Sequence, residues 1–342
     1  MKKKVIWMVL SGWTVFTLLL SACAPAVVEE EKVVPKEEVV TPKEEVVPRE
    51  VVAPKEEGNL VKWTGTKKDG TVVERMIEKP RYGGTISIFG SDEPVRWDDL
   101  VRPQDNWPLG VVQEPLQLFD WLQGPLGTNE FDKSAFQGTP PIPGTFETGL
   151  VAESWERPGP DTMVYHIRQG INFALDPTSE ASRLVGGREM TAADVAYTSQ
   201  RSWSIGYFKR NYPYLIDLKN VEKSIYVSPT DPWAVVLESQ PGLLGTAFRH
   251  LPGGRNKIVA REVIEKYGKE GEIIDWKRVV GSGPFMLENY VGASSLTYVK
   301  NPNYWARDPF FPENRLPYMD GFKVLIIPDK STATAALRVG KL

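Results

Sequence analysis

Residue types that could support catalysis are scarce in this 342-residue sequence. It contains two histidines, His166 and His250, and a single cysteine, Cys23. Their spacing to one another and to carboxylates matches no zinc site. Gly281-Ser282-Gly283 lacks the G-x-S-x-G spacing of a nucleophile elbow, and Pro252-Gly253-Gly254-Arg255 lacks the lysine of a phosphate-binding loop. We therefore predict no catalytic residues, no metal site and no cofactor.

A hydrolase that uses two carboxylates is the one enzyme class that these residues do not exclude. Asp98 and Asp99 are adjacent in the sequence. Neighbouring side chains on a strand point to opposite faces, whereas a glycosidase needs two carboxyl groups that flank one bond. This pair therefore argues weakly for hydrolysis.

The N-terminal segment has the pattern of an export signal. Lys2, Lys3 and Lys4 precede an uncharged apolar stretch over residues 5–22. Leu20-Ser21-Ala22-Cys23 resembles a bacterial lipobox, in which the cysteine receives a lipid and becomes the new N-terminus after cleavage. An uncleaved anchor is the alternative, because roughly 18 apolar residues is the lower limit for a membrane span. Both interpretations place the rest of the chain outside the cytoplasm, in the periplasm or at the cell surface.

Residues 23–80 predict a tether. A unit of the type VVPKEE recurs between residues 33 and 57, and its prolines and charges prevent it from forming a packed core. Residues 58–80 are polar and irregular, so we expect ordered structure to begin near Arg81. The whole chain has a net charge of −3, and its body lacks the basic patch that nucleic acid would require.

The body alternates short strands with helices, which predicts an α/β fold. Strands are expected over residues 85–89, 151–156, 163–168, 296–299 and 321–327, and helices over 111–122, 191–203, 261–269 and 331–340. Thr191 and Asp194 have the spacing of a capping box, so Asp194 is predicted to cap a helix and not to act as a catalytic acid. Trp155, Trp203 and Trp305 are expected to pack within the fold.

Seven blocks in a fixed order resemble one protein family. They are residues 82–85 (YGGT), 150–156 (LVAESWE), 165–168 (YHIR), 190–197 (MTAADVAY), 281–285 (GSGPF), 301–305 (NPNYW) and 326–341 (IIPDKSTATAALRVGK). Together they look like the bacterial extracellular solute-binding proteins of the peptide/nickel type, family 5. The chain departs from the family pattern after Phe173 and in a long loop over residues 123–149.

The resemblance implies a periplasmic-binding-protein-like fold of type II, with two lobes and an extra small domain. The implied boundaries are a signal peptide at 1–22, the lipidated cysteine and tether at 23–80, the first part of lobe I at 81–110, the small domain at 111–250 and a return to lobe I at 251–342. We expect the chain to end near the crossover to lobe II. The acid that pairs with a peptide's amino terminus in this family would lie beyond that point.

The same resemblance implies a receptor that captures a small solute and passes it to the permease and ATPase subunits of an ABC importer. The loop after the first strand and an aromatic segment after the capped helix would contact the ligand. The ligand-binding residues predicted in this way are Pro103, Gln104, Asp105, Asn106, Trp107, Tyr212 and Tyr214. Oligopeptides, dipeptides, nickel complexes and sugars remain possible ligands. A surface lipoprotein that senses or scaffolds without import is the alternative function.

Overall fold

The structure is a computed structural model that describes residues 57–94, 96–98, 100, 107–131, 146–211, 213–245 and 256–342. The chain divides into two compact units, Met1–Pro54 and Lys55–Leu342, and all described residues belong to the second. The predicted signal peptide, Cys23 and the VVPKEE repeats up to residue 56 lie outside the described residues.

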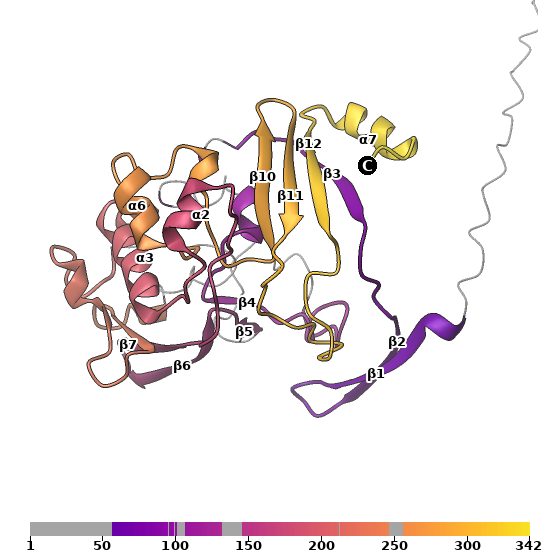
Figure 1. The fold of residues 1–342 in the computed structure, drawn as a ribbon. Coiled ribbons are helices and arrows are strands. Elements are labelled where there is room, and N and C mark those ends of the chain that lie inside the picture. The colour runs from indigo at the N-terminus through magenta and orange to yellow at the C-terminus, as the bar shows by residue number, and fades with distance from the viewer. Residues whose placement is uncertain are drawn as a thin grey trace, which may run out of the picture. The chain divides into compact units, whose positions relative to one another are not determined.

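One mixed sheet contains strands from both ends of the described chain. It consists of β10 (Phe285–Val291), β11 (Ser295–Lys300), β12 (Gly321–Ile326) and β3 (Thr85–Gly90), in that order (Figure 1). β12 runs parallel to β3, and the other pairs are antiparallel. Ile86 lies opposite Phe322 and Ile88 opposite Val324, on the face that buries Tyr298 and Leu296. The predicted strands near 85, 296 and 321 are confirmed.

A second, fully antiparallel sheet is formed within the middle of the chain. Its order is β6 (Ala152–Gly159), β7 (Thr162–Ile167), β9 (Ala234–Glu238) and β8 (Ile225–Val227). Helix α3 (Ala192–Ser204) packs on β8 and β9 and contributes the completely buried Trp203 to the core. The predicted strands near 151 and 163 and the helix near 191 are confirmed.

The other helices of the described chain are short. They are α2 (Glu180–Val185), α4 (Tyr207–Asn211), α6 (Arg261–Tyr267), α7 (Lys330–Arg338) and the 3₁₀ helices η1 (Glu57–Asn59), η2 (Trp107–Val111), η4 (Val221–Lys223) and η5 (Trp276–Arg278). No helix in these described ranges is long and apolar enough to cross a membrane.

Helix caps follow the sequence closely in one case and differ in another. At the start of α3, Asp194 Oδ2 accepts hydrogen bonds from Thr191 N (3.0 Å) and Thr191 Oγ1 (3.2 Å), so its predicted capping role is confirmed. The sequence predicts a helix from residue 331, whereas α7 begins at Lys330 and its cap is Asp329, because Asp329 Oδ1 accepts from Thr332 N at 2.8 Å. Hydrogen bonds from Ser331 and Thr332 lower the pKa of Asp329 to about 2.

The predicted helix over residues 111–122 is wrong. η2 ends at Val111, and the chain then forms the short strand β4 (Gln117–Phe119), which pairs with β5 (Glu147–Gly149). Pro115 lies in the middle of the predicted helix, where a proline removes a hydrogen bond and clashes with the preceding turn.

Ordered structure also begins earlier than predicted. β1 (Leu60–Thr66) and β2 (Val72–Glu78) form an antiparallel hairpin in the segment assigned to the tether. The hairpin is held by contacts distant in sequence, because the Trp63 ring packs 5.4 Å from that of Phe310 and Arg75 Nη1 donates to Pro125 O at 2.6 Å. The Asp69-Gly70 turn was the local signal for this hairpin, since Gly70 has a φ of +87°.

Candidate functional site

Most of the predicted ligand-binding residues fall outside the described part of the chain. This applies to Pro103, Gln104, Asp105, Asn106 and Tyr212. Trp107 is the first residue of η2. Tyr214 is half-buried against the hydrophobic core, and its carbonyl oxygen accepts a 2.7 Å hydrogen bond from Gln240 N. The assignment of these residues to a ligand site therefore stays a prediction.

The structure joins residues that precede the two predicted segments. The Leu100 carbonyl oxygen, three residues before Pro103, accepts a 2.6 Å hydrogen bond from Tyr207 N, which precedes Tyr212 and Tyr214. Gly206 makes this approach possible, since a Cβ there would lie 2.6 Å from Leu100 O. The loop after β3 and the segment after α3 are thus joined by their backbones.

A buried ion pair fixes the loop side of this junction. The carboxylate of Asp98 pairs with the guanidinium of Arg201 on α3, and both residues are less than 10% exposed. Asp98 also accepts from the backbone N–H groups of Leu100 and Ile273, each at 3.1 Å. Arg201 Nε donates to Gly271 O at 2.7 Å. The pair therefore joins three separate segments of the chain.

A fourth segment reaches the same helix. Asn256 is buried and contacts α3 through both ends of its amide: Nδ2 donates to Ser199 Oγ at 3.0 Å, and Oδ1 accepts from Ser202 Oγ at 2.9 Å. The C-terminal half of α3 is thus the platform on which these chain segments converge. Binding sites are commonly built from loops held on such a rigid element.

The loop after β3 is also anchored on the β10–β11 hairpin. Glu93 Oε1 accepts from Ala293 N at 2.8 Å and from the hydroxyl of Tyr290. The hydrogen bond from Tyr290 lowers the pKa of Glu93, while desolvation and this carboxylate raise the pKa of Tyr290 to about 12. Trp97 packs edge-on to Tyr290, with ring centroids 4.9 Å apart. The part of the loop that precedes Pro103 in the sequence is therefore held in place by contacts with this hairpin.

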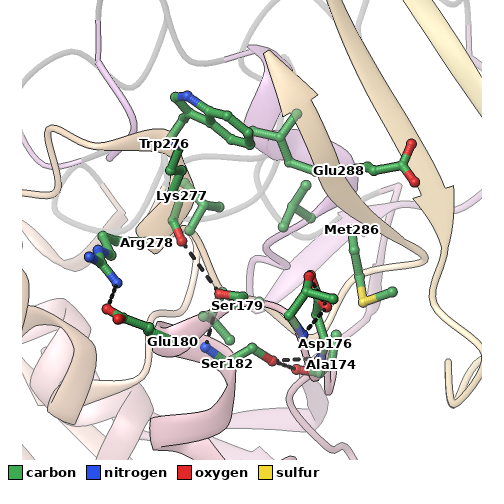
Figure 2. Close-up of a pocket in the computed structure, with 16 residues that line it drawn as sticks. Ala174, Asp176, Ser179, Glu180, Ser182, Trp276, Lys277, Arg278, Met286 and Glu288 are labelled. Carbon is green, nitrogen blue, oxygen red and sulfur yellow. Dashed lines mark hydrogen bonds and ion pairs between the residues drawn. The ribbon is translucent and has the colours of Figure 1, made fainter.

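A pocket of about 380 Å³ lies between α2, η5 and β10. Figure 2 shows Trp276 on one side of it and Asp176, Ser179 and Ser182 on the opposite side, with Met286 projecting from β10. The volume is at the lower end of the range for sites that hold small ligands. Sequence analysis did not identify this pocket, because its walls come from segments about 100 residues apart.

Polar contacts hold the walls of this pocket together. Arg278 pairs with Glu180 of α2, and this cation lowers the pKa of the Glu180 carboxyl. Ser179 Oγ donates to Lys277 O at 3.4 Å, and Ser182 Oγ donates to Ala174 O at 2.8 Å (Figure 2). α2 and η5 are thereby joined at one end of the pocket.

A buried carboxylate, Glu114, was also missed by the sequence analysis. It is 2% exposed and accepts hydrogen bonds from Ser282 Oγ (2.7 Å), Tyr304 OH (2.7 Å) and Trp305 Nε1 (3.1 Å). Burial raises its pKa, with these donors and Arg168 acting in the opposite direction. Ser282 is completely buried, so it has a structural role and is not presented to a substrate. The GSG and NPNYW blocks thus meet at Glu114.

The histidine and carboxylate groups in the described ranges form no metal-binding cluster of three or more. His166 on β7 lies between Glu156 (3.6 Å) and Asp231 (3.5 Å) on the partly exposed face of the sheet. His250 lies outside these ranges.

Comparison with known proteins identifies relatives that are binding proteins. Residues 147–342 match the model of the bacterial extracellular solute-binding proteins, family 5. Heme-binding protein A of Haemophilus influenzae is 27% identical over 200 residues, covering 56% of this chain and 34% of that protein. The dipeptide-binding protein of Pseudomonas aeruginosa is 25% identical over 172 residues, covering 47% of this chain and 31% of that protein.

Solved structures share the fold. The periplasmic binding protein DppA of Helicobacter pylori, in complex with the peptide STSA, aligns with a TM-score of 0.52 at 21% identity, over 77% of this chain and 46% of that one. OppA of Haemophilus influenzae, in complex with the peptide RPPGFSPFR, aligns with a TM-score of 0.52 at 18% identity, over 77% and 45%. The predicted periplasmic-binding-protein-like α/β fold is confirmed.

The chain spans about a third of the length of its curated relatives and under half of the solved structures. The family match covers more than half of this chain and contains α3, the second sheet, β10 to β12 and the Glu114 donors Ser282, Tyr304 and Trp305. The chain belongs to the bacterial extracellular solute-binding proteins, family 5.

Proposed function

We propose that this chain is part of a receptor that captures a peptide-like solute outside the cytoplasm and delivers it to an ABC importer. The family match over residues 147–342 carries this proposal. The named relatives are binding proteins, and two of the structural neighbours hold peptides. No enzymatic step is needed, because capture and release are the whole chemical event.

The ligand site that we propose is formed by Pro103, Gln104, Asp105, Asn106 and Trp107 together with Tyr212 and Tyr214. The hydrogen bond between Leu100 O and Tyr207 N supports it, since it joins the two segments that carry these residues. Their amide, carboxylate and aromatic groups suit a peptide, which needs polar partners for its backbone and permissive walls for its side chains.

In the domain organisation that we propose, the mixed sheet belongs to lobe I, over residues 81–110 and 251–342. The antiparallel sheet then belongs to the small domain over residues 111–250. A lipid on Cys23 would anchor the receptor to the membrane. The repeats would act as a spacer at roughly 3.1 Å per residue where they are extended. The partners would be the permease and ATPase subunits of the importer.

The test uses the full-length protein purified from its host. Native mass spectrometry should detect a co-purified peptide, and a tripeptide library should raise the melting temperature. Absence of both a bound molecule and a thermal shift would contradict a peptide receptor. Recovery of heme would instead indicate the ligand named for the Haemophilus relative.

A matched pair of variants tests the ligand site. Trp107→Ala should weaken peptide binding by about 5- to 150-fold, because an aromatic wall contributes about 1–3 kcal/mol. Trp121→Ala is the control, since Trp121 is 48% exposed and lies outside the proposed site. Equal affinities in the two variants would exclude the loop after β3 as a ligand contact.

A further inference from the structure

The outer edge of β10 faces the pocket between α2 and η5. β10 is the first strand of its sheet, so β11 is its only strand neighbour in the described sheet. Met286, Leu287 and Glu288 of β10 line the pocket (Figure 2). Backbone groups on such an edge can pair with an added strand.

Strand register shows which backbone groups are available. Asn301 N donates to Pro284 O at 2.9 Å, which makes residues 284 and 301 a hydrogen-bonded pair. Hydrogen-bonded and non-hydrogen-bonded pairs alternate in an antiparallel ladder. Leu287, which lies opposite Tyr298, is therefore in a non-hydrogen-bonded pair. Its N–H and C=O point away from β11, toward the outer edge, and bond to none of the described residues.

A bulge limits how far this edge can extend. The register shifts between Leu287 and Asn289, so Glu288 is the extra residue. Bulges interrupt a regular edge and oppose pairing with a long strand. The bulge and the pocket volume of about 380 Å³ both favour a short ligand over the strand of a folded partner.

The charges of the pocket suit a ligand with a free amine. Asp176 Oδ1 accepts from Thr178 N (2.8 Å) and Thr178 Oγ1 (2.7 Å), whereas its Oδ2 has no hydrogen bond within the described residues. Across the pocket, the Lys277 ammonium lies 5.8 Å from the ring centroid of Trp276 and forms no ion pair with a described residue. Asp176 Oδ2 and the Lys277 ammonium thus remain available on opposite walls, and the Glu288 carboxylate on β10, which also lines the pocket, forms no hydrogen bond or ion pair within the described residues either.

We propose that this pocket binds an extended peptide of two or three residues. The ligand's backbone pairs with the N–H and C=O of Leu287, its ammonium donates to Asp176 Oδ2, and its carboxylate faces Lys277. This site is separate from the loop after β3, and it does not depend on the function proposed for that loop.

The experiment is calorimetric titration of the full chain with trialanine and with N-acetyl-trialanine. Trialanine should bind, and acetylation of its amine should weaken binding about tenfold, because a charge-assisted hydrogen bond is lost. Asp176→Asn should weaken binding of trialanine by a similar factor and leave the acetylated peptide unchanged. Asparagine keeps the acceptor for Thr178 N, so the start of α2 is preserved.

Two controls separate this site from other effects. Asp69 also accepts from the N–H two residues ahead, at 2.8 Å, but lies in the β1–β2 turn, so Asp69→Asn should not change affinity. Leu287→Pro removes the edge donor without removing a ladder hydrogen bond, and it should weaken both peptides. Asp176→Asn remains decisive if Leu287→Pro does not fold.

Three results would overturn the proposal: no binding of trialanine, equal binding of the two peptides, or unchanged binding by Asp176→Asn. Titration of Trp107→Ala distinguishes the two sites. If trialanine binding is lost in Trp107→Ala and kept in Asp176→Asn, the loop after β3 is supported and the pocket is excluded. The reverse result supports the pocket independently of the loop.

Discussion

The Tyr304 hydroxyl donates a 2.7 Å hydrogen bond to Oε1 of Glu114, a residue 190 positions earlier in the chain. Ser282 and Trp305 donate to the other carboxylate oxygen. Three donors therefore compensate in part for the burial of this carboxyl group, since a buried charge without partners is strongly unfavourable.

Glu114→Gln should change how stability depends on pH. The pKa of Glu114 in the folded protein is raised above its usual value of 4.5. Between 4.5 and this raised pKa, the folded state keeps a proton that the unfolded state has released. The Glu114 contribution is thus full below pH 4.5 and declines as pH rises through the folded pKa. The variant lacks this decline.

Urea denaturation of both proteins between pH 4 and pH 8 measures the difference. At pH 4 the wild type should be more stable by about 1–3 kcal/mol, because the amide nitrogen of glutamine cannot accept a hydrogen bond from a neighbouring donor, whereas both oxygens of the protonated carboxyl group can. This advantage should shrink toward neutral pH. A difference that is constant across the range would show that Glu114 keeps its usual pKa.

Local signals explain which elements could be predicted. The capping box of Thr191 and Asp194 is made within four residues, so the sequence alone determines where α3 begins. The β1–β2 hairpin instead depends on Trp63 packing against Phe310, across a separation that no local pattern reveals. The apolar residues within 111–122 have helical spacing. The chain nevertheless bends there, because Pro115 interrupts a helix and Glu114 is buried.

In the candidate site, too, contacts between residues distant in sequence could not be predicted. Family order predicts that the loop after β3 and the segment after α3 both contact the ligand, and the bond from Tyr207 N to Leu100 O joins the residues that precede these two segments. The sequence could not reveal that Asp98 pairs with Arg201, because the two residues are 103 positions apart. The pocket beside β10 was missed for the same reason.

Asp98→Asn should destabilise the protein by about 3 kcal/mol, because it leaves Arg201 buried without its counter-charge. The matched control is Glu74→Gln. Glu74 pairs with Lys62 at 2.7 Å, but both side chains are more than half exposed, so this change should cost less than about 1 kcal/mol. The free energies of unfolding from urea titrations test both values. Equal costs would show that burial does not decide the strength of the Asp98 pair.

Gly281→Ala should destabilise the protein by about 1–3 kcal/mol through overpacking. A Cβ at this position would lie 1.9 Å from the Val112 carbonyl oxygen, which also accepts a 2.8 Å hydrogen bond from Gly283 N. Gly245→Ala is the control, since Gly245 has no atom within 4 Å of its added Cβ. Thermal unfolding of the two variants should separate them clearly. A melting temperature for Gly281→Ala equal to that of wild type would refute the close packing of Gly281 against Val112.

Trp203→Ala should cost about 3–5 kcal/mol, because it removes a completely buried side chain. The Trp203 ring of α3 stacks on the Phe208 ring of α4 with centroids 4.5 Å apart. Phe208 directly follows Tyr207, whose N–H bonds to the Leu100 carbonyl oxygen. Trp121→Ala should change stability far less, since that side chain is 48% exposed. Urea denaturation measures both costs. If Trp203 instead contacted a ligand, its removal would lower peptide affinity while leaving the free energy of unfolding nearly unchanged.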